Sequence, residues 1–194
     1  MLKKLPIHAL VLSILLLMAP HAALAAYKYA HAEAEYIVEL PEAPLAETIW
    51  AQNRSVPYIE NPPKYGALGE IATVKRVDPT NGDAFYVVIT FVKSDRDYLL
   101  SLDEEKLKDI LKKDMSNVML EDAKFSCSQG TGTLKWATLS GFSVDKNNAV
   151  LFNTEHFLVG EGSIMVLRVS YSVENPTYSE YYKVLSESIT YIGR

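Results

Sequence analysis

The chain has 194 residues and a formal net charge of −5, and 48% of its residues are hydrophobic. This length suits one domain with a sizeable core. The acidic balance argues against nucleic acid and anionic membrane surfaces as partners, because both attract basic patches, and the single cysteine excludes an internal disulfide.

The first 25 residues have the pattern of a secretory signal peptide. Lys3 and Lys4 precede the almost entirely apolar stretch Leu10–Met18, and the small residues of Ala23–Ala25 suit a cleavage site. We expect cleavage after Ala25 or one residue later, and a periplasmic or secreted protein with no stable membrane anchor. A retained anchor is the alternative, but the apolar stretch is short for a spanning helix, and no cysteine stands nearby for lipid attachment.

Residues 26–35 are rich in alanine and charge and have no regular period. They are predicted to form a flexible or weakly helical lead-in before a single domain over residues 36–194. His31, Glu33 and Glu35 could be drawn as a metal site, but their spacing is not that of helical neighbours and no second histidine is near. We therefore expect a solvated tail that binds no metal.

A short strand is predicted over Tyr36–Leu40, where Pro41 ends it. The segment 42–68 that follows contains four prolines and shows no sustained period. One interpretation places two helical turns over Ala46–Asn53, and the remainder is expected to be an ordered loop laid over the sheet.

Three aromatic residues in this segment, Trp50, Tyr58 and Tyr65, form the candidate binding site. Their rings are costly to leave in water, loops carry function more often than the scaffold does, and exposed aromatic rings are common anchors at interfaces. We therefore expect a protein or a small-molecule ligand to bind here. The alternative is that these rings only cover the core.

Gly69–Val77 and Ala84–Val92 are expected to form a hairpin, because Pro79 and Asn81–Gly82 between them favour a turn. The second strand is apolar on both faces, as in a central strand with helices on each side.

A helix is predicted next, with a capping box at Ser101 and Glu104 and acidic residues at the positive end of the helix dipole. Its expected buried stripe is Leu107, Ile110 and Leu111, extended by Met115 and Val118. A strand over Lys124–Ser128 follows. Alternation places Cys127 on the same side as Phe125, so we expect a buried and chemically inert thiol.

The last third of the chain has three long predicted strands in succession, at 134–144, 149–159 and 163–173. The turns between them are short enough for hairpins and too short for parallel crossovers, so an antiparallel meander is predicted.

A closing amphipathic helix is predicted after the meander. Either Asn175 with Pro176 at the first helical position, or a capping box at Thr177 and Glu180, would begin it, and Gly193 would end it. Its apolar stripe has helical spacing: Tyr178, Tyr181, Tyr182, Leu185, Ile189 and Ile192. The core is therefore expected to be a sheet with this helix on one face.

Groups that could form a catalytic site are few. His156 lies in a predicted strand and is expected to pack near a sheet rim rather than act as a base. The glycine-rich stretches at 130–133 and 160–163 are predicted turns, since neither has the spacing of a nucleotide-binding loop. No motif of a nucleophile, a zinc protease or a redox pair occurs. We therefore expect no catalytic residue, cofactor or metal, although a pair of carboxylates stays open.

The order of these elements resembles the PsbP-like group, which includes the DcrB-like bacterial lipoproteins. The resemblance rests on Tyr36–Pro41 (YIVELP), followed by a hairpin, a helix, a meander and a C-terminal helix. It implies an α+β fold, a single-domain α/β/α sandwich around a mainly antiparallel central sheet. Members act mainly as non-catalytic accessory or binding proteins. The lipid-attachment cysteine of the DcrB-like members is absent here, and no functional residue of the group can be matched.

The sequence therefore predicts an exported, non-catalytic accessory or binding protein. Two alternatives stay open. One is a carrier of a small apolar ligand, held between the sheet and the tyrosine-rich C-terminal helix. The other is a hydrolase that uses a carboxylate pair signalled by no motif, since likeness of fold does not carry function across.

Overall fold

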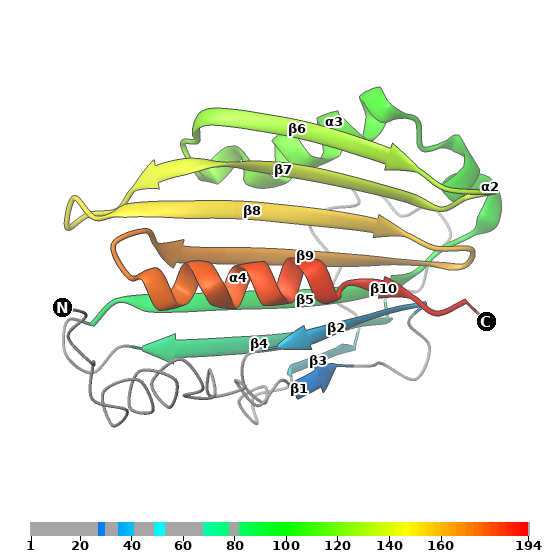
Figure 1. Ribbon diagram of the computed structural model, residues 1–194. Coiled ribbons are helices and arrows are strands. Elements are labelled where there is room, and N and C mark those ends of the chain that lie inside the picture. The colour runs from blue at the N-terminus through cyan, green and yellow to red at the C-terminus, as the bar shows by residue number, and fades with distance from the viewer. Residues whose placement is uncertain (1–26, 30–34, 41–48, 53–67, 78–81, 194) are drawn as a thin grey trace, which may run out of the picture.

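The structure, a computed structural model, describes residues 27–29, 35–40, 49–52, 68–77 and 82–193. Seven strands form the main sheet in the order β3–β4–β5–β9–β8–β7–β6, and every neighbouring pair is antiparallel (Figure 1). The predicted hairpin is β4–β5 and the predicted meander is β7–β8–β9, so both predictions are confirmed. The strands are β3 (Ile49–Gln52), β4 (Leu68–Val77), β5 (Ala84–Lys93), β6 (Glu121–Gln129), β7 (Lys135–Val144), β8 (Val150–Val159) and β9 (Ser163–Ser172).

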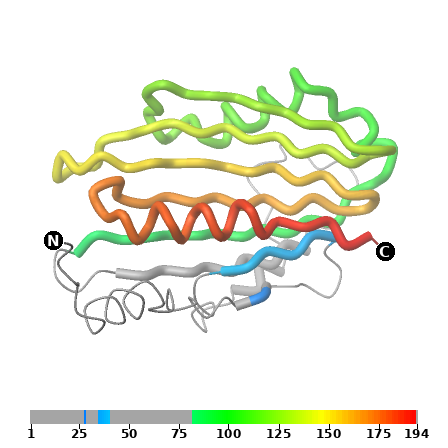
Figure 2. Tube along the Cα trace, viewed as in Figure 1, coloured from blue at the N-terminus to red at the C-terminus, as the bar shows by residue number. Residues whose placement is uncertain are grey.

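A second, smaller sheet has β2 (Tyr36–Leu40) between β1 (Tyr27–Tyr29) and β10 (Thr190–Tyr191). Figure 2 shows the C-terminal segment, in red, running beside β2. The prediction of a flexible or weakly helical lead-in over residues 26–35 is wrong for β1, because its backbone pairs with Val38–Leu40.

Helices cover both faces of the main sheet, which confirms the α/β/α sandwich (Figure 1). One face packs against α4 and β2, and the other against α2, α3 and a short 3₁₀ turn, η1. Among the described residues no helix is long and apolar enough to cross a membrane. The helices are α2 (Arg96–Ser101), α3 (Glu104–Asp114), η1 (Met115–Asn117) and α4 (Pro176–Ser188).

The side chains of β5 explain its central place in the sheet. Phe85 and Val87 are fully buried on the α4 face. On the opposite face Thr90 and Val92 are buried, and Val92 belongs to the core beneath α2 and α3. Cover on this second face is incomplete, since Tyr86 near the start of the strand is 38% exposed.

The first helix was predicted to begin at a capping box formed by Ser101 and Glu104, and this prediction is wrong. Ser101 is the last residue of α2, and Asp103 is the N-cap of α3, with its carboxylate accepting a 2.9 Å hydrogen bond from the backbone N–H of Lys106. Asp95 caps α2 in the same way. The helix that Asp95 caps includes Ser101 as its last residue. Ser101 is therefore not free to begin a second helix, and Asp103 caps α3 instead.

The buried stripe predicted for α3 is correct at its centre and changes at its end. Leu107 and Leu111 are fully buried, while Ile110 is half-buried. Met115 is also buried, but it lies in η1, beyond the last α-helical residue. The stripe therefore continues through a tighter 3₁₀ turn rather than through a longer helix.

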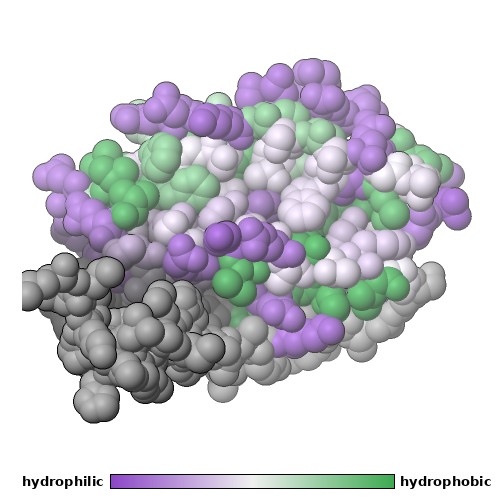
Figure 3. Space-filling model, in the orientation of Figure 1, coloured by the Kyte–Doolittle hydropathy of each residue, from purple (hydrophilic) through white to green (hydrophobic). Residues whose placement is uncertain are grey.

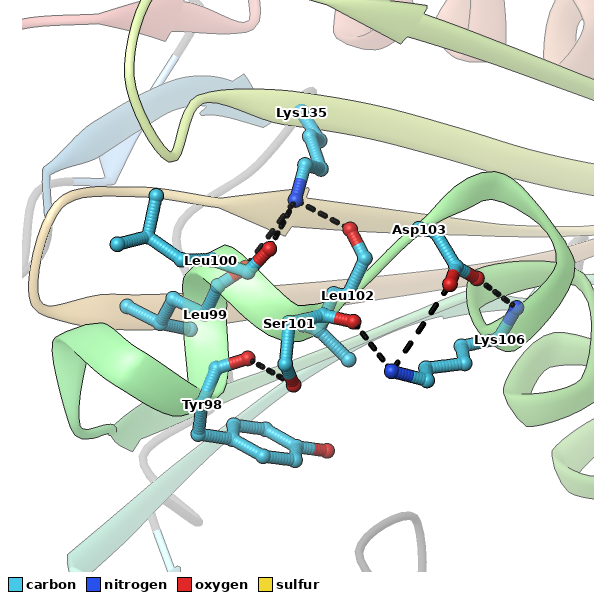
Figure 4. Close-up of polar contacts among 8 residues, drawn as sticks. All are labelled: Tyr98, Leu99, Leu100, Ser101, Leu102, Asp103, Lys106 and Lys135. Carbon is cyan, nitrogen blue, oxygen red and sulfur yellow. Dashed lines mark hydrogen bonds and ion pairs between the residues drawn. The ribbon is translucent and has the colours of Figure 1, made fainter.

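A buried lysine joins this helical pair to the sheet. Lys135, at the start of β7, is 9% exposed, and its ammonium group donates to the carbonyl oxygens of Leu99, Leu100 and Leu102 (Figure 4). These carbonyls lie at the end of α2, where the last carbonyl groups and the helix dipole favour a cation. The hydrogen bonds offset the cost of removing the charge from water.

The two helical turns predicted over Ala46–Asn53 are replaced by strand β3. Ile49–Gln52 pairs with Leu68–Ile71 of β4 in antiparallel register, at the edge of the main sheet. A four-residue segment gains more from backbone hydrogen bonds to an existing strand than from a helix too short to be stable alone. The rest of the segment 42–68, apart from the first residue of β4, lies outside the described residues.

The closing helix begins where the first of the two predicted caps placed it. Asn175 accepts a hydrogen bond from the backbone N–H of Thr177 at 3.1 Å, and Pro176 is the first helical residue. The helix ends at Ser188, before the predicted stop at Gly193, because Thr190–Tyr191 leave it to pair with β2.

The prediction of a solvated tail is wrong for Glu35. It is 6% exposed, and its carboxylate accepts hydrogen bonds from the backbone N–H groups of Glu161 (3.0 Å) and Gly162 (3.1 Å) and from the Ser163 hydroxyl (2.7 Å). Gly160 makes this approach possible, since a Cβ there would lie 2.1 Å from Glu35 Oε2. The residue before β2 is thereby fastened to the β8–β9 turn. His31 and Glu33 lie outside the described residues.

Cys127 is half-buried rather than buried. It points to the same side of β6 as Phe125, as alternation predicts, and both contact the core beneath α3. Cys127 is not fully buried because β6 is an edge strand of the sheet. Partial burial raises the pKa of the thiol, which keeps it protonated.

Candidate functional site

The helix α4 covers only part of its face of the sheet. It lies along β9 and β5 and in front of them (Figure 1). The same face of β7 carries Trp136 and Thr138, both half-buried, and Phe142, which is 38% exposed. Figure 3 shows this face: hydrophobic and near-neutral side chains, in green and white, gather over the open part of the sheet. The sheet thus offers apolar surface beside a helix.

A groove of about 490 Å³ runs along the junction between α4 and the sheet. Strands β7, β8 and β9 supply one wall and the helix supplies the other. We call it the aromatic groove, and the residues that define it here are Phe142, Phe152, Tyr171, Val173, Tyr182 and Lys183.

Four aromatic rings form a continuous surface in the aromatic groove. The ring centroid of Phe152 lies 5.7 Å from that of Phe142, 5.3 Å from that of Tyr171 and 5.2 Å from that of Tyr182. These separations and the tilted or edge-on ring planes are those of favourable aromatic pairs. Burial raises the pKa of both Tyr171 and Tyr182, so their hydroxyls stay neutral. The surface is therefore apolar with neutral hydroxyl groups.

His156 is hydrogen-bonded to Tyr182, a residue of the groove. Its Nδ1 lies 2.9 Å from the Thr138 hydroxyl and 3.3 Å from Nε1 of Trp136, and its Nε2 lies 3.3 Å from the Tyr182 hydroxyl. An indole N–H can only donate, so Nδ1 is an acceptor and Nε2 carries the proton that is donated to Tyr182. His156 is 4% exposed and lies on an inner strand rather than at a sheet rim. It packs as predicted, but in the interior.

His156 is expected to weaken folding at acid pH. Burial lowers its pKa from 6.5 to about 4. The unfolded chain therefore binds a proton that the folded protein excludes, and the free energy of unfolding falls as the pH drops from 6.5 towards 4. Between pH 6.5 and pH 5 this loss should reach about 1.5 kcal/mol.

Urea unfolding of the wild type and of His156→Gln at pH 6.5 and pH 5 checks this prediction. The glutamine variant, which has no titrating ring, should lose less stability over the interval. An equal loss in both proteins would show that His156 does not titrate as its burial requires.

Two acidic side chains meet Arg168 on the opposite face of the sheet. Nε and Nη2 of Arg168 donate to Oε2 of Glu155 at 2.8 and 2.7 Å, and Nη2 also donates to Asp114. The side chain of Glu155 is fully buried, and its Oε1 has no hydrogen-bond partner among the described residues. Burial and the neighbouring Asp114 raise the pKa of Glu155 more than Arg168 lowers it.

These residues form the kind of carboxylate pair that the sequence left open. Glu155 is fully buried and its Oε2 binds Arg168, so Glu155 offers no accessible oxygen to a substrate, and both acidic groups serve here to pair with Arg168. Among the described residues no group of three or more His, Cys, Asp or Glu side chains could hold a metal ion.

The binding residues predicted from the sequence are not brought together in the described part of the chain. Trp50 lies in β3 opposite Glu70 of β4, but its side chain, like Tyr58 and Tyr65 as a whole, lies outside what the structure describes. The groove residues Phe142, Phe152 and Tyr171 were not singled out. Pairing the three predicted strands of the meander in register could have indicated them. Phe142 lies opposite Phe152 on the next strand, and Phe152 lies opposite Tyr171 on the one after.

No family model and no curated protein matches the chain. Solved structures do match it. The chain is similar to the cyanobacterial PsbP protein (CyanoP) from Synechocystis, with a TM-score of 0.50 and 12% identity over 89% of this chain and 95% of that one.

Two further solved structures are similar. One is LpqN, involved in cell envelope biogenesis of Mycobacterium tuberculosis, with a TM-score of 0.42 and 13% identity over 86% of this chain and 83% of that one. The other is PA94, a Pseudomonas aeruginosa protein of unknown function, with a TM-score of 0.38 and 12% identity over 81% of this chain and 91% of that one. At such identities the comparison with CyanoP shows the fold alone, and it confirms that this chain has the PsbP-like α/β/α fold.

Proposed function

We propose that this chain is an exported, non-catalytic binding protein whose aromatic groove holds a small apolar ligand. The observation that carries the proposal is the half-open aromatic surface between α4 and the sheet. Export is supported by the signal-peptide pattern of residues 1–25. Intact mass of the secreted protein should show a chain that begins at or next to Ala26, and a mass that includes residues 1–25 would contradict export.

The chemistry of the groove favours an apolar ligand of limited size. A volume of about 490 Å³ lies within the range of small-molecule sites. Each Å² of apolar surface removed from water contributes about 25 cal/mol, so a ligand that covers two or three rings gains several kcal/mol. The hydroxyls of Tyr171 and Tyr182 are neutral and can orient a polar end of the ligand.

The apolar fluorophore N-phenyl-1-naphthylamine tests the groove directly. Its fluorescence should rise on binding to the wild type, and Phe142→Ala should weaken binding about tenfold or more, because it removes the most exposed of the four aromatic rings in the groove. The matched control is Tyr86→Ala. Tyr86 is equally exposed, at 38%, but faces the other side of the sheet. Absence of binding, or an equal loss in both variants, would contradict the proposal.

The surface first predicted around Trp50, Tyr58 and Tyr65 stays a separate proposal. Trp50→Ala or Tyr58→Ala would abolish capture of a partner without changing the thermal midpoint if these rings bind a partner. The same changes would lower stability by about 3–5 kcal/mol if the rings only cover the core.

A further inference from the structure

A second hollow lies on the opposite face of the sheet from the aromatic groove. It has a volume of about 420 Å³ and opens between the end of α3, the η1 turn and the strands β6 and β7. Its floor is apolar, and two lysines of α3 stand on its rim. We call it the lysine hollow, and the residues that matter to it are Lys108, Lys112, Met115, Leu120, Phe125 and Leu139.

The hollow follows from the way β6 joins the sheet. Asp122 has a positive φ of 49°, and the register of β6 against β7 shifts between Glu121 and Lys124. The chain passes close over Gly141, where a Cβ would lie 2.9 Å from the Glu121 carbonyl oxygen. The irregular start of β6 thus leaves space beside the regular pair formed by Phe125 and Leu139.

The apolar floor and the basic rim come from different elements. Leu139 is almost fully buried, Phe125 is half-buried, and Met115 closes the inner end from η1. Lys108 and Lys112 are one helical turn apart on α3, so their side chains point in the same direction. The ammonium group of Lys108 lies 5.9 Å from the centroid of the Phe125 ring.

The charges of the two lysines are little compensated. Lys108 lies 3.9 Å from Glu105, at the outer limit of an ion pair and with Glu105 largely exposed. The ammonium group of Lys112 has no hydrogen-bond or ion-pair partner among the described residues. An exposed ion pair such as Lys108–Glu105 contributes little free energy. Both ammonium groups can therefore bind an anionic ligand.

We infer that the lysine hollow binds a small anionic amphiphile, a long-chain carboxylate, with its chain on Leu120, Phe125 and Leu139 and its carboxylate between Lys108 and Lys112. Charge complementarity selects this class of ligand. A cationic amphiphile would be repelled, and an uncharged one would gain nothing from the rim. The volume of about 420 Å³ suits a single small ligand.

Isothermal titration with sodium laurate, kept below its micellar concentration, tests the inference. The wild type should bind laurate, more weakly at high salt, and should bind 1-dodecanol less tightly. Lys108→Met combined with Lys112→Met keeps the aliphatic stems and removes the charges, so it should weaken laurate binding at least tenfold and leave dodecanol unchanged. The control is Lys113→Met, because Lys113 is an exposed residue of the same helix and does not line the hollow. This variant should bind laurate like the wild type.

Each alternative outcome overturns the inference. Absence of laurate binding, or equal laurate affinity in the wild type and the double lysine variant, would exclude the lysine hollow as a carboxylate site. Loss of laurate binding in Phe142→Ala, with no effect of the lysine changes, would place the fatty acid in the aromatic groove. The naphthylamine probe keeps the two sites distinguishable, because its binding should not respond to changes at Lys108 and Lys112.

Discussion

Replacement of Arg168 by methionine is expected to lower the free energy of unfolding by about 3–5 kcal/mol. The change removes the guanidinium group that donates to Asp114 and Glu155, and leaves the fully buried Glu155 and the mostly buried Asp114 without this donor. Arg96→Met is the control, because Arg96 is 68% exposed and its ion pair with Glu161 is 3.7 Å long. It should cost less than about 0.5 kcal/mol. Similar losses in both variants would mean that the buried cluster is not formed.

Glu155→Gln separates the charge of this cluster from its packing. Because the pKa of Glu155 is raised in the folded protein, the unfolded chain releases a proton that the folded protein keeps. The free energy of unfolding should therefore fall as the pH rises above the usual value of 4.5.

The glutamine variant should lack this fall, which can reach about 1.4 kcal/mol per pH unit. Urea unfolding at about pH 7 and about pH 8 measures it in a range where the titration of His156 changes the free energy of unfolding little. The same slope in the wild type and in Glu155→Gln would contradict a protonated Glu155.

Leu185→Ala is expected to cost about 2–5 kcal/mol, through lost transfer free energy and the cavity left behind. Leu185 is fully buried in α4 and belongs to the core that this helix forms with β2 and the sheet. Glu187→Ala, an exposed position two residues later, should change stability by less than about 0.5 kcal/mol. Denaturant unfolding of both variants checks the facing of the helix.

The size of the Leu185 loss also reports on the small sheet. α4 holds β2 against the core, and the hydroxyl of Ser188 accepts a hydrogen bond from the backbone N–H of Glu39. A loss below about 1 kcal/mol would show that α4 does not pack on the sheet as described.

Elements with strong local signals could be predicted from the sequence. The β4–β5 hairpin, the β7–β8–β9 meander and the Asn175 cap of α4 each depend on residues close together in the chain. Turn chemistry, alternation and capping act over a few residues, so the sequence pattern contains the needed information. The α/β/α layering followed, because a strand that is apolar on both faces requires cover on both.

The errors occurred where a distant partner decides the local structure. Residues 49–52 became a strand because β4 was there to pair with, and Thr190–Tyr191 left the helical pattern to pair with β2. Glu35 looked like part of a charged tail, and only the backbone N–H groups of the β8–β9 turn make its burial favourable. Such partners lie about 20 residues away for β3 and more than a hundred residues away for β10 and Glu35, and pairing over these separations leaves no periodic trace in the sequence.

The sequence by itself determined the fold class, the central sheet, the two helical layers and an expected exported state. Only the tertiary structure decided where candidate sites lie. The aromatic groove exists because α4 covers β9 and β5 but leaves the aromatic rings of β7 and β8 partly open, and the lysine hollow exists because β6 joins the sheet with a bulge. A site is the space left between elements, and that space depends on how they pack and not on how each one forms.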